Sequence, residues 1–193
     1  MQKLTPSDLF TLEAYSRERA AFRARVIAHK QPRTVHLGAH LTLLFEDRLT
    51  IQYQIQEMLR IERIFEVAGI AEELEAYNPL IPDGHNLKAT LLIEYADADE
   101  RARQLVALHG IEHAIEFHVA GHAPVRPVAD EDLDRATADK TSAVHFLRFE
   151  FDAGQIAALR AGAQARLAVA HPAYRGEVLL SPATRDALVA DFA

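Results

Sequence analysis

The chain has 193 residues, enough for one substantial domain, and contains no cysteine. The lack of thiols excludes disulfides, cysteine nucleophiles, thiolate zinc sites and thiolate-bound iron–sulfur clusters. A net charge of −7 argues against a large nucleic-acid interface or binding to an anionic membrane, both of which need clustered Lys and Arg. The first residues do not form a secretion signal, and no later run is apolar over the ~20 residues that span a membrane. We therefore expect a cytoplasmic globular protein.

The N-terminal segment is predicted to be a helix over about residues 6–28. Thr5, followed by proline and then by Asp8 three residues later, is a helix-start pattern. Apolar residues then recur on one helical face: Leu12, Tyr15, Phe22 and Val26. Over residues 35–45 the apolar period changes to two, with Gly38 as a bend, bulge or turn. This pattern predicts a strand or hairpin.

Residues 47–68 are predicted to form one long helix that is apolar on too many sides to lie on the surface. Asp47 fits an N-cap, and Gly69 follows the expected end. The apolar residues fill one stripe and the positions beside it: Leu49, Ile51, Tyr53, Ile55, Met58, Leu59, Ile61, Ile64, Phe65 and Val67. Such a helix must be covered either by the rest of its own domain or by another protein.

Strand and helix patterns alternate through the remainder of the chain. Strands are predicted at 87–95, 115–119 and 143–151, through Leu167 and Val169, and at the sequence EVLL. Helices are predicted at 98–109, at 152–163 and after Ser181, with Pro182 at the first position. The loop PVADEDLDRATADKT is expected to be exposed. The fold class is α+β with mixed or antiparallel sheets, either as one domain over residues 1–193 or divided into 1–96 and 97–193.

Ten histidines in a chain without cysteine raise the question of a metal or acid–base site. His145 and His171 share parity with apolar strand residues, so both are expected on apolar faces at strand ends, where they could meet beside Tyr174. His118 and His122 lie around a further strand, but their irregular spacing does not ensure that about three ligands converge. The alternative is that these histidines are hydrogen-bonded in the core or exposed to solvent.

The predicted long helix also carries an i,i+3 pair, Glu57 and Arg60. The pair is expected either to be buried, with an Arg fork satisfying the carboxylate, or to be an ordinary surface ion pair. We favour the buried arrangement because Tyr53, Ile61 and Ile64 flank the polar strip. The chain contains no glycine-rich nucleotide-binding motif and no nucleophile-elbow motif.

Five segments of the chain resemble a bacterial family known only as a domain of unknown function. They are LFEDRLTIQYQIQEMLRIERIFE, EELEAYNPLIPDG, KATLLIEY, AVHFLRFEF and HPAYRGEV. The resemblance extends over nearly the whole chain. By gene neighbourhood it implies a companion of rubrerythrin-like proteins and iron–sulfur oxidoreductases, and hence a role in redox or peroxide-stress metabolism. It implies no catalytic residues.

Two functional hypotheses follow from these observations. In the first, an accessory protein binds a redox protein, or a second copy of itself, through the long helix, with these anchors: Tyr53, Met58, Arg60 and Phe65. In the second, a small enzyme or metal sensor uses His145, His171 and Tyr174, with His118 and His122 as further ligands of a divalent metal.

Overall fold

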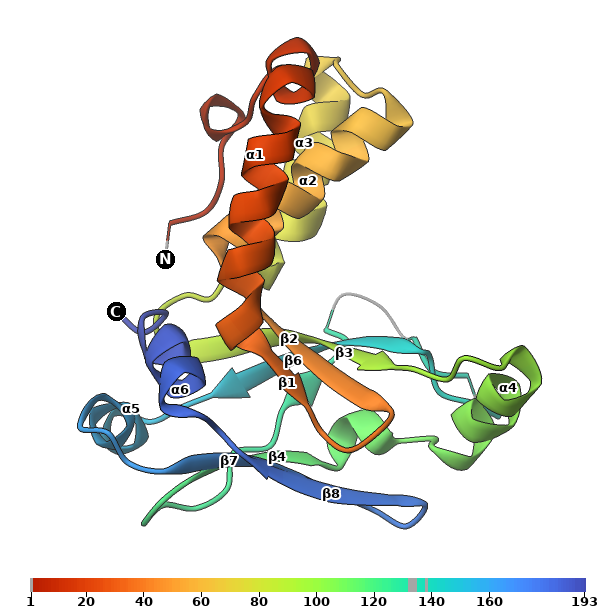
Figure 1. Cartoon of the computed structure of the whole chain (residues 1–193), viewed down its shortest axis with the longest axis vertical. Coiled ribbons are helices and arrows are strands. Elements are labelled where there is room, and N and C mark those ends of the chain that lie inside the picture. Colours follow the sequence, from red (N-terminus) through yellow and green to blue (C-terminus); the bar gives the residue numbers. More distant parts are fainter. Residues whose placement is uncertain (1, 132–134, 138) are drawn as a thin grey trace.

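The computed structural model describes residues 2–131, 135–137 and 139–193, and its strands form a large sheet and a small sheet (Figure 1). The large sheet has the order β1 (Thr34–His36), β2 (Leu41–Glu46), β3 (Asn86–Ile93), β6 (Val144–Glu150) and β5 (Val128–Ala129). The small sheet has the order β4 (Ile115–Val119), β7 (Ala165–His171) and β8 (Tyr174–Leu179). Every strand pair within the described residues is antiparallel. The α+β prediction is confirmed in its antiparallel form.

The main hydrophobic core lies between the two sheets, which are stacked face to face in Figure 1. Alternate residues of each strand point into this core, as the period-two pattern predicts. Phe117 of the small sheet packs with Phe45 and Phe149 of the large sheet, at ring-centroid distances of 6.5 and 6.1 Å. The other residues of β2, β3 and β6 face away from the core, and this outer face of the large sheet lies on the side of the helical layer.

The helical layer consists of α1 (Leu12–Lys30), α2 (Arg48–Glu62) and α3 (Val67–Tyr77), which stand together above one end of the large sheet (Figure 1). Ile51, Ile55 and Leu59 of α2 are buried in a cluster that also contains Leu74 of α3. Tyr53 of α2 packs against the aromatic residues of α1. Most of the apolar surface of α2 is therefore covered by the protein's own chain.

The prediction of one helix over 47–68 is wrong beyond Glu62. The helix ends at Glu62, because Arg63 adopts the left-handed conformation with φ of 56° and the amide of Ile64 bonds back to the carbonyl of Leu59. Gly69, expected just after the helix, lies inside α3. The break is hidden in the sequence because the left-handed residue is an arginine and not a glycine.

Other boundaries differ by a few residues or agree. The predicted helix 6–28 begins as a separate 3-10 turn, η1 (Pro6–Asp8), before α1 starts at Leu12. Gly38 makes the turn of the β1–β2 hairpin with φ of +78°. Ser181 caps the last helix as predicted. The remaining helices are α4 (Ala98–Ala107), α5 (Ala153–Arg160) and α6 (Pro182–Val189), with 3-10 turns η2 (Gln31–Arg33), η3 (Asn78–Leu80) and η4 (Ile111–His113).

The predicted exposed loop 127–141 is only partly an excursion. It contains β5, and Thr141 at its end is buried, while residues 132–134 and 138 lie outside the described residues. The large sheet takes strands from both of the segments 1–96 and 97–193, and a division between them stays a prediction. No helix in the described part of the chain is long and apolar enough to cross a membrane.

Candidate functional site

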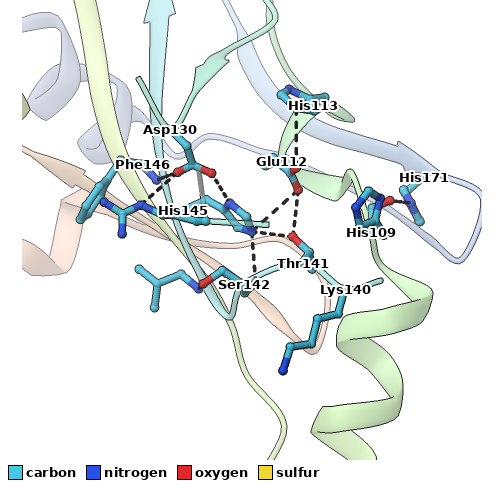
Figure 2. A network of polar contacts seen from close by, with 12 residues as sticks. His109, Glu112, His113, Asp130, Lys140, Thr141, Ser142, His145, Phe146 and His171 are labelled. Atoms are coloured by element: carbon cyan, nitrogen blue, oxygen red, sulfur yellow. Dashed lines mark hydrogen bonds and ion pairs between the residues drawn. The ribbon is translucent and has the colours of Figure 1, made fainter. Parts of the chain in front are cut away.

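A buried polar network surrounds His145, which β6 places on its core-facing side with a relative exposure of 0%. Figure 2 shows that the network joins β6 to the loop before it. The ring Nδ1 lies 2.6 Å from Oδ2 of Asp130, and Nε2 lies 2.7 Å from Oγ1 of Thr141 and 3.1 Å from the carbonyl oxygen of Ser142. The other oxygen of Asp130 accepts the backbone amide of Phe146 at 2.9 Å. The network therefore fastens the loop to the sheet.

The ring of His145 is enclosed by polar groups of the loop that precedes β6. Nδ1 therefore faces the carboxylate of Asp130, and Nε2 faces both the hydroxyl of Thr141 and the carbonyl of Ser142. The hydroxyl of Thr141 also donates to Oε2 of Glu112 at 3.1 Å, which extends the network to η4. The order Thr–His–Asp resembles a nucleophile, base and orienting acid, but every member is engaged and His145 does not reach solvent.

His171 belongs to a separate group of contacts, although it is buried at a strand end as predicted. Its Nε2 donates to the carbonyl of His109 at 3.1 Å, and its Nδ1 accepts the amide of Ala173 at 3.2 Å. Figure 2 shows His171 joined to His109 and not to His145. The hydroxyl of Tyr174, the predicted partner, instead donates to the carbonyl of Leu37 at 3.0 Å. The structure therefore does not bring the predicted histidine site together.

The other predicted histidine ligands lie on or beside the small sheet. Nε2 of His118 lies 3.0 Å from Oε2 of Glu116, and Nδ1 lies 3.3 Å from a guanidinium nitrogen of Arg166. His122 is exposed in the turn after β4. Among the residues that the structure describes, no group of three or more His, Asp or Glu side chains is placed to hold a metal ion. The metal hypothesis stays a prediction.

Glu57 of α2 makes its main contacts with α1. Nε and Nη2 of Arg19 each bond to one carboxylate oxygen at 2.8 Å, and the hydroxyl of Tyr15 donates to Oε1 at 2.6 Å. The bonds from Arg19 lower the pKa of Glu57 to about 2. Arg60 is a peripheral member of this group, 3.4 Å away with its side chain 42% exposed. The prediction of a buried Glu57–Arg60 pair is therefore wrong, because the main cationic partner of Glu57 is Arg19 of α1 and Arg60 is partly exposed.

A second buried ionic group, missed by the sequence reasoning, lies at the base of the helical layer. Arg33 of η2 bonds through both terminal nitrogens to Asp191, at 2.8 and 2.7 Å, and to the carbonyl of Ala187 at 2.8 Å. Its Nε lies 3.3 Å from Oδ2 of Asp47, which also contacts Nε2 of His29 at 2.5 Å. These contacts tie the end of α1, the start of α2 and the segment after α6 together.

Burial and charge act in opposite directions on this group. Burial disfavours the charged form of Arg33, but the bonds and charges of Asp191 and Asp47 outweigh it and raise the pKa of the guanidinium. Burial also raises the pKa of Asp191, against the opposing influence of Arg33. The guanidinium is therefore the charge that holds these carboxylates in a buried place.

A cleft of about 500 Å³ opens on the outer face of the large sheet. Its floor includes Glu46, Lys88 and Arg148, which stand in register across β2, β3 and β6. Strand parity turns these polar residues away from the core and into one row. Further residues complete the lining: Pro79, Leu80, Asp83, Ala89, Glu131, Phe146, Leu147 and Glu150.

The charged groups of the cleft are unequally satisfied. Arg148 bonds to Glu131 at 2.7 and 2.8 Å and also to Glu150, so its guanidinium is fully engaged. Lys88 donates to the carbonyl of Pro79, and burial lowers the pKa of its ammonium. Glu46 is only 3% exposed, and its Oε1 accepts the hydroxyl of Thr90 at 2.9 Å. Its Oε2 has no hydrogen-bond partner among the described residues.

An exposed apolar surface lies at the turn between α2 and α3. Ile61, Phe65 and Val67 are 59%, 70% and 82% exposed, and we call these three residues the hairpin tip. Of the predicted partner anchors, Phe65 lies in the tip and the exposed Arg60 precedes it on α2. Met58 is half-buried, and Tyr53 packs on Phe22 of α1 at a ring-centroid distance of 6.0 Å. The predicted anchors therefore do not form one continuous surface.

Comparison with known proteins places the chain in a family without assigning a reaction. No curated protein matches it. A crystal structure of a novel protein of unknown function from Burkholderia pseudomallei K96243 is 50% identical, with a TM-score of 0.95 and 100% of both chains covered. A family model described as "Protein of unknown function (DUF3501)" matches residues 3–192. The predicted resemblance to a domain of unknown function is thereby confirmed, and the chain belongs to the DUF3501 family.

Proposed function

We propose that the protein is a cytoplasmic accessory protein that binds another protein through its hairpin tip. The observation that carries the proposal is the exposure of Ile61, Phe65 and Val67 close together in the chain at the turn between α2 and α3. Grouped exposed apolar side chains on a folded protein are typical of interaction sites. Most apolar side chains of residues 47–68 are covered by the fold, and the exceptions lie at this turn.

The charges beside the tip indicate the chemistry of the partner. α3 carries Glu72, Glu73 and Glu75 and contains no Lys or Arg. Burial and the charges of Glu62 and Glu72 raise the pKa of Glu73, so negative potential accumulates along this helix. The complementary surface is an apolar pocket with Lys or Arg on the side that faces α3, because the exposed Arg60 and Arg63 lie beside the tip itself.

The resemblance to companions of redox proteins suggests which partner this is. A rubrerythrin-like protein or an iron–sulfur oxidoreductase carries its own metal centre. A chain without cysteine has no thiolate to share with such a centre, and an accessory role suits that composition. The redox or peroxide-stress assignment rests on the resemblance alone.

Binding can be tested with purified candidate partners of these two classes from the same source. A tip variant with Ile61→Ser, Phe65→Ser and Val67→Ser should bind at least about 30-fold more weakly in biolayer interferometry, since one interface hot spot contributes about 2 kcal/mol. The matched control is Val106→Ser with Leu179→Ser, whose side chains are each 55% exposed on α4 and β8. The control should bind as wild type does, and added salt should slow association.

Two results would contradict the proposal. One is equal binding by the tip variant and the wild type; the other is no binding of either partner class by the wild type. Light scattering on the protein alone provides a further check. A dimer that dissociates in the tip variant would mean that the tip is covered by a second copy of the chain and not by a different protein.

A further inference from the structure

We infer that the cleft on the outer face of the large sheet binds a small organic cation, an ammonium group on an apolar body, through the carboxylate of Glu46. This site is separate from the hairpin tip and does not depend on the proposed partner. The volume of about 500 Å³ lies within the range of roughly 300–1,000 Å³ that small-molecule sites occupy.

The first argument is the unsatisfied carboxylate. An ionised carboxylate offers about four acceptor positions, and burial without partners is costly. Glu46 is buried, receives one bond from Thr90, and has no hydrogen bond to Oε2 from any residue that the structure describes. A donor from outside the fold would satisfy this oxygen.

The second argument is the position of the cation on the adjacent strand. Lys88 stands directly opposite Glu46 in the β2–β3 register, where opposite charges normally pair. Its ammonium instead donates to the carbonyl of Pro79. No ion pair within the described residues involves Glu46. The charge of Arg33 acts on Glu46 without a hydrogen bond, so Oε2 keeps an open acceptor position within the described residues.

The third argument concerns the charge of the ligand. Four carboxylates line the cleft, from Glu46, Asp83, Glu131 and Glu150, against two basic groups. Arg148, one of the two, is engaged by Glu131 and Glu150, and Lys88 is the other. An anionic ligand would have to break these contacts, whereas a cation would meet an available acceptor in a negative field.

The fourth argument separates an organic cation from a metal ion. A metal site needs several converging ligands, and no such group of His, Asp or Glu occurs among the described residues. The cleft offers one buried carboxylate beside the apolar side chains of Pro79, Leu80 and Phe146. One acceptor next to apolar walls matches an ammonium that carries an aliphatic or aromatic body.

The test compares ligands of one shape and three charges by isothermal titration calorimetry. Phenethylamine is expected to bind at millimolar concentration or below, with 2-phenylethanol and 3-phenylpropionate at least about tenfold weaker. Glu46→Gln should weaken phenethylamine binding about tenfold or more, whereas Glu177→Gln, an exposed carboxylate on β8, should leave it unchanged. Leu80→Trp, which fills the cleft and keeps Glu46, should also abolish binding.

The stability of the variants makes the result decisive. Glu46→Gln keeps the shape of the side chain and an acceptor for the hydroxyl of Thr90, so its unfolding midpoint should stay close to that of the wild type. Undiminished phenethylamine binding by Glu46→Gln or Leu80→Trp would overturn the inference, as would no binding to the wild type. Binding of Mg²⁺ or Ca²⁺ that Glu46→Gln abolishes would replace it with a metal site. The hairpin-tip variant should bind phenethylamine normally, so that failure of the two proposals can be told apart.

Discussion

Replacing Arg33 with methionine should destabilise the fold more than any change to one of its partners. The methionine keeps most of the apolar stem and removes the guanidinium that contacts both Asp191 and Asp47. The variant loses paired bonds to Asp191 and the bond to the carbonyl of Ala187. Asp47, Asp191 and the neighbouring Glu46 are all buried, so the variant leaves carboxylates with little access to water.

The expected cost follows from the burial of the remaining charges. Breaking a buried ion pair by removing one member costs about 3–5 kcal/mol, against about 5–15 kcal/mol for the stability of a whole domain. For a chain of this length that cost corresponds to a fall of roughly 6 to 20 °C in the unfolding temperature. Asp191→Asn should cost less, about 1–3 kcal/mol, because Arg33 keeps Asp47 and the carbonyl of Ala187.

The pH dependence gives a second, independent readout. Because burial raises the pKa of Asp191 in the folded protein above its ordinary value of 3.8, the native state binds this proton more tightly than the unfolded state does. The contribution of Asp191 to the free energy of unfolding therefore decreases as pH rises above 3.8. Without Arg33 the opposing influence is gone and the effect grows. The deficit of Arg33→Met relative to the wild type should shrink from about pH 7.5 to about pH 4.5.

Urea unfolding followed by circular dichroism at both pH values measures these quantities for the wild type and both variants. A double variant completes a mutant cycle that isolates the coupling of Arg33 with Asp191. A cost below about 1 kcal/mol for Arg33→Met at neutral pH would refute the reasoning, since it would mean that the buried carboxylates are not held by the guanidinium. A deficit that grows in acid would refute the assigned sign.

Three further predictions concern the other polar groups. Glu57→Gln should cost about 1–3 kcal/mol and Arg60→Gln less than about 1 kcal/mol, because Arg19 is the main partner of Glu57. The pKa of Glu57 is lowered from 4.5 to about 2, so its contribution to the free energy of unfolding is complete above pH 4.5 and is lost as pH falls towards 2. The urea midpoints of the wild type and Glu57→Gln should therefore converge in acid. A constant difference between the two midpoints across this pH range would contradict the prediction. Asp130 accepts a hydrogen bond from the backbone amide of Phe146, so Asp130→Asn should speed hydrogen exchange at this amide. Unchanged protection would contradict the inference that the network fastens the loop to the sheet.

Secondary structure can be predicted from the sequence here where neighbouring residues determine it. Alternation through 87–95 predicts the buried side of β3. Asp47 and Ser181 cap their helices as their side chains predict. The end of α2 is not visible, because Arg63 makes a left-handed turn without the glycine that usually marks one.

The candidate sites depend on strand order and on contacts between distant segments. Glu46, Lys88 and Arg148 form one row only once β3 lies between β2 and β6, which no periodicity specifies. Parity predicts correctly that His145 is buried, but its partner Asp130 lies in a loop whose return to the sheet has no sequence signal. The helix pattern pairs Glu57 with Arg60, three residues away, whereas its main partner, Arg19, lies 38 residues away on α1.

The bond between Arg33 and Asp191 joins residues 158 positions apart, and this separation has a consequence for biosynthesis. At about 5–20 residues per second, Asp191 is synthesised roughly 8 to 32 s after Arg33. During this interval α1 and α2 can pack, and Arg33 has Asp47 beside it but not yet its paired bonds to Asp191. Chaperones and proteases thus meet a nascent chain whose helices are assembled while the charged base beneath them is still open to water.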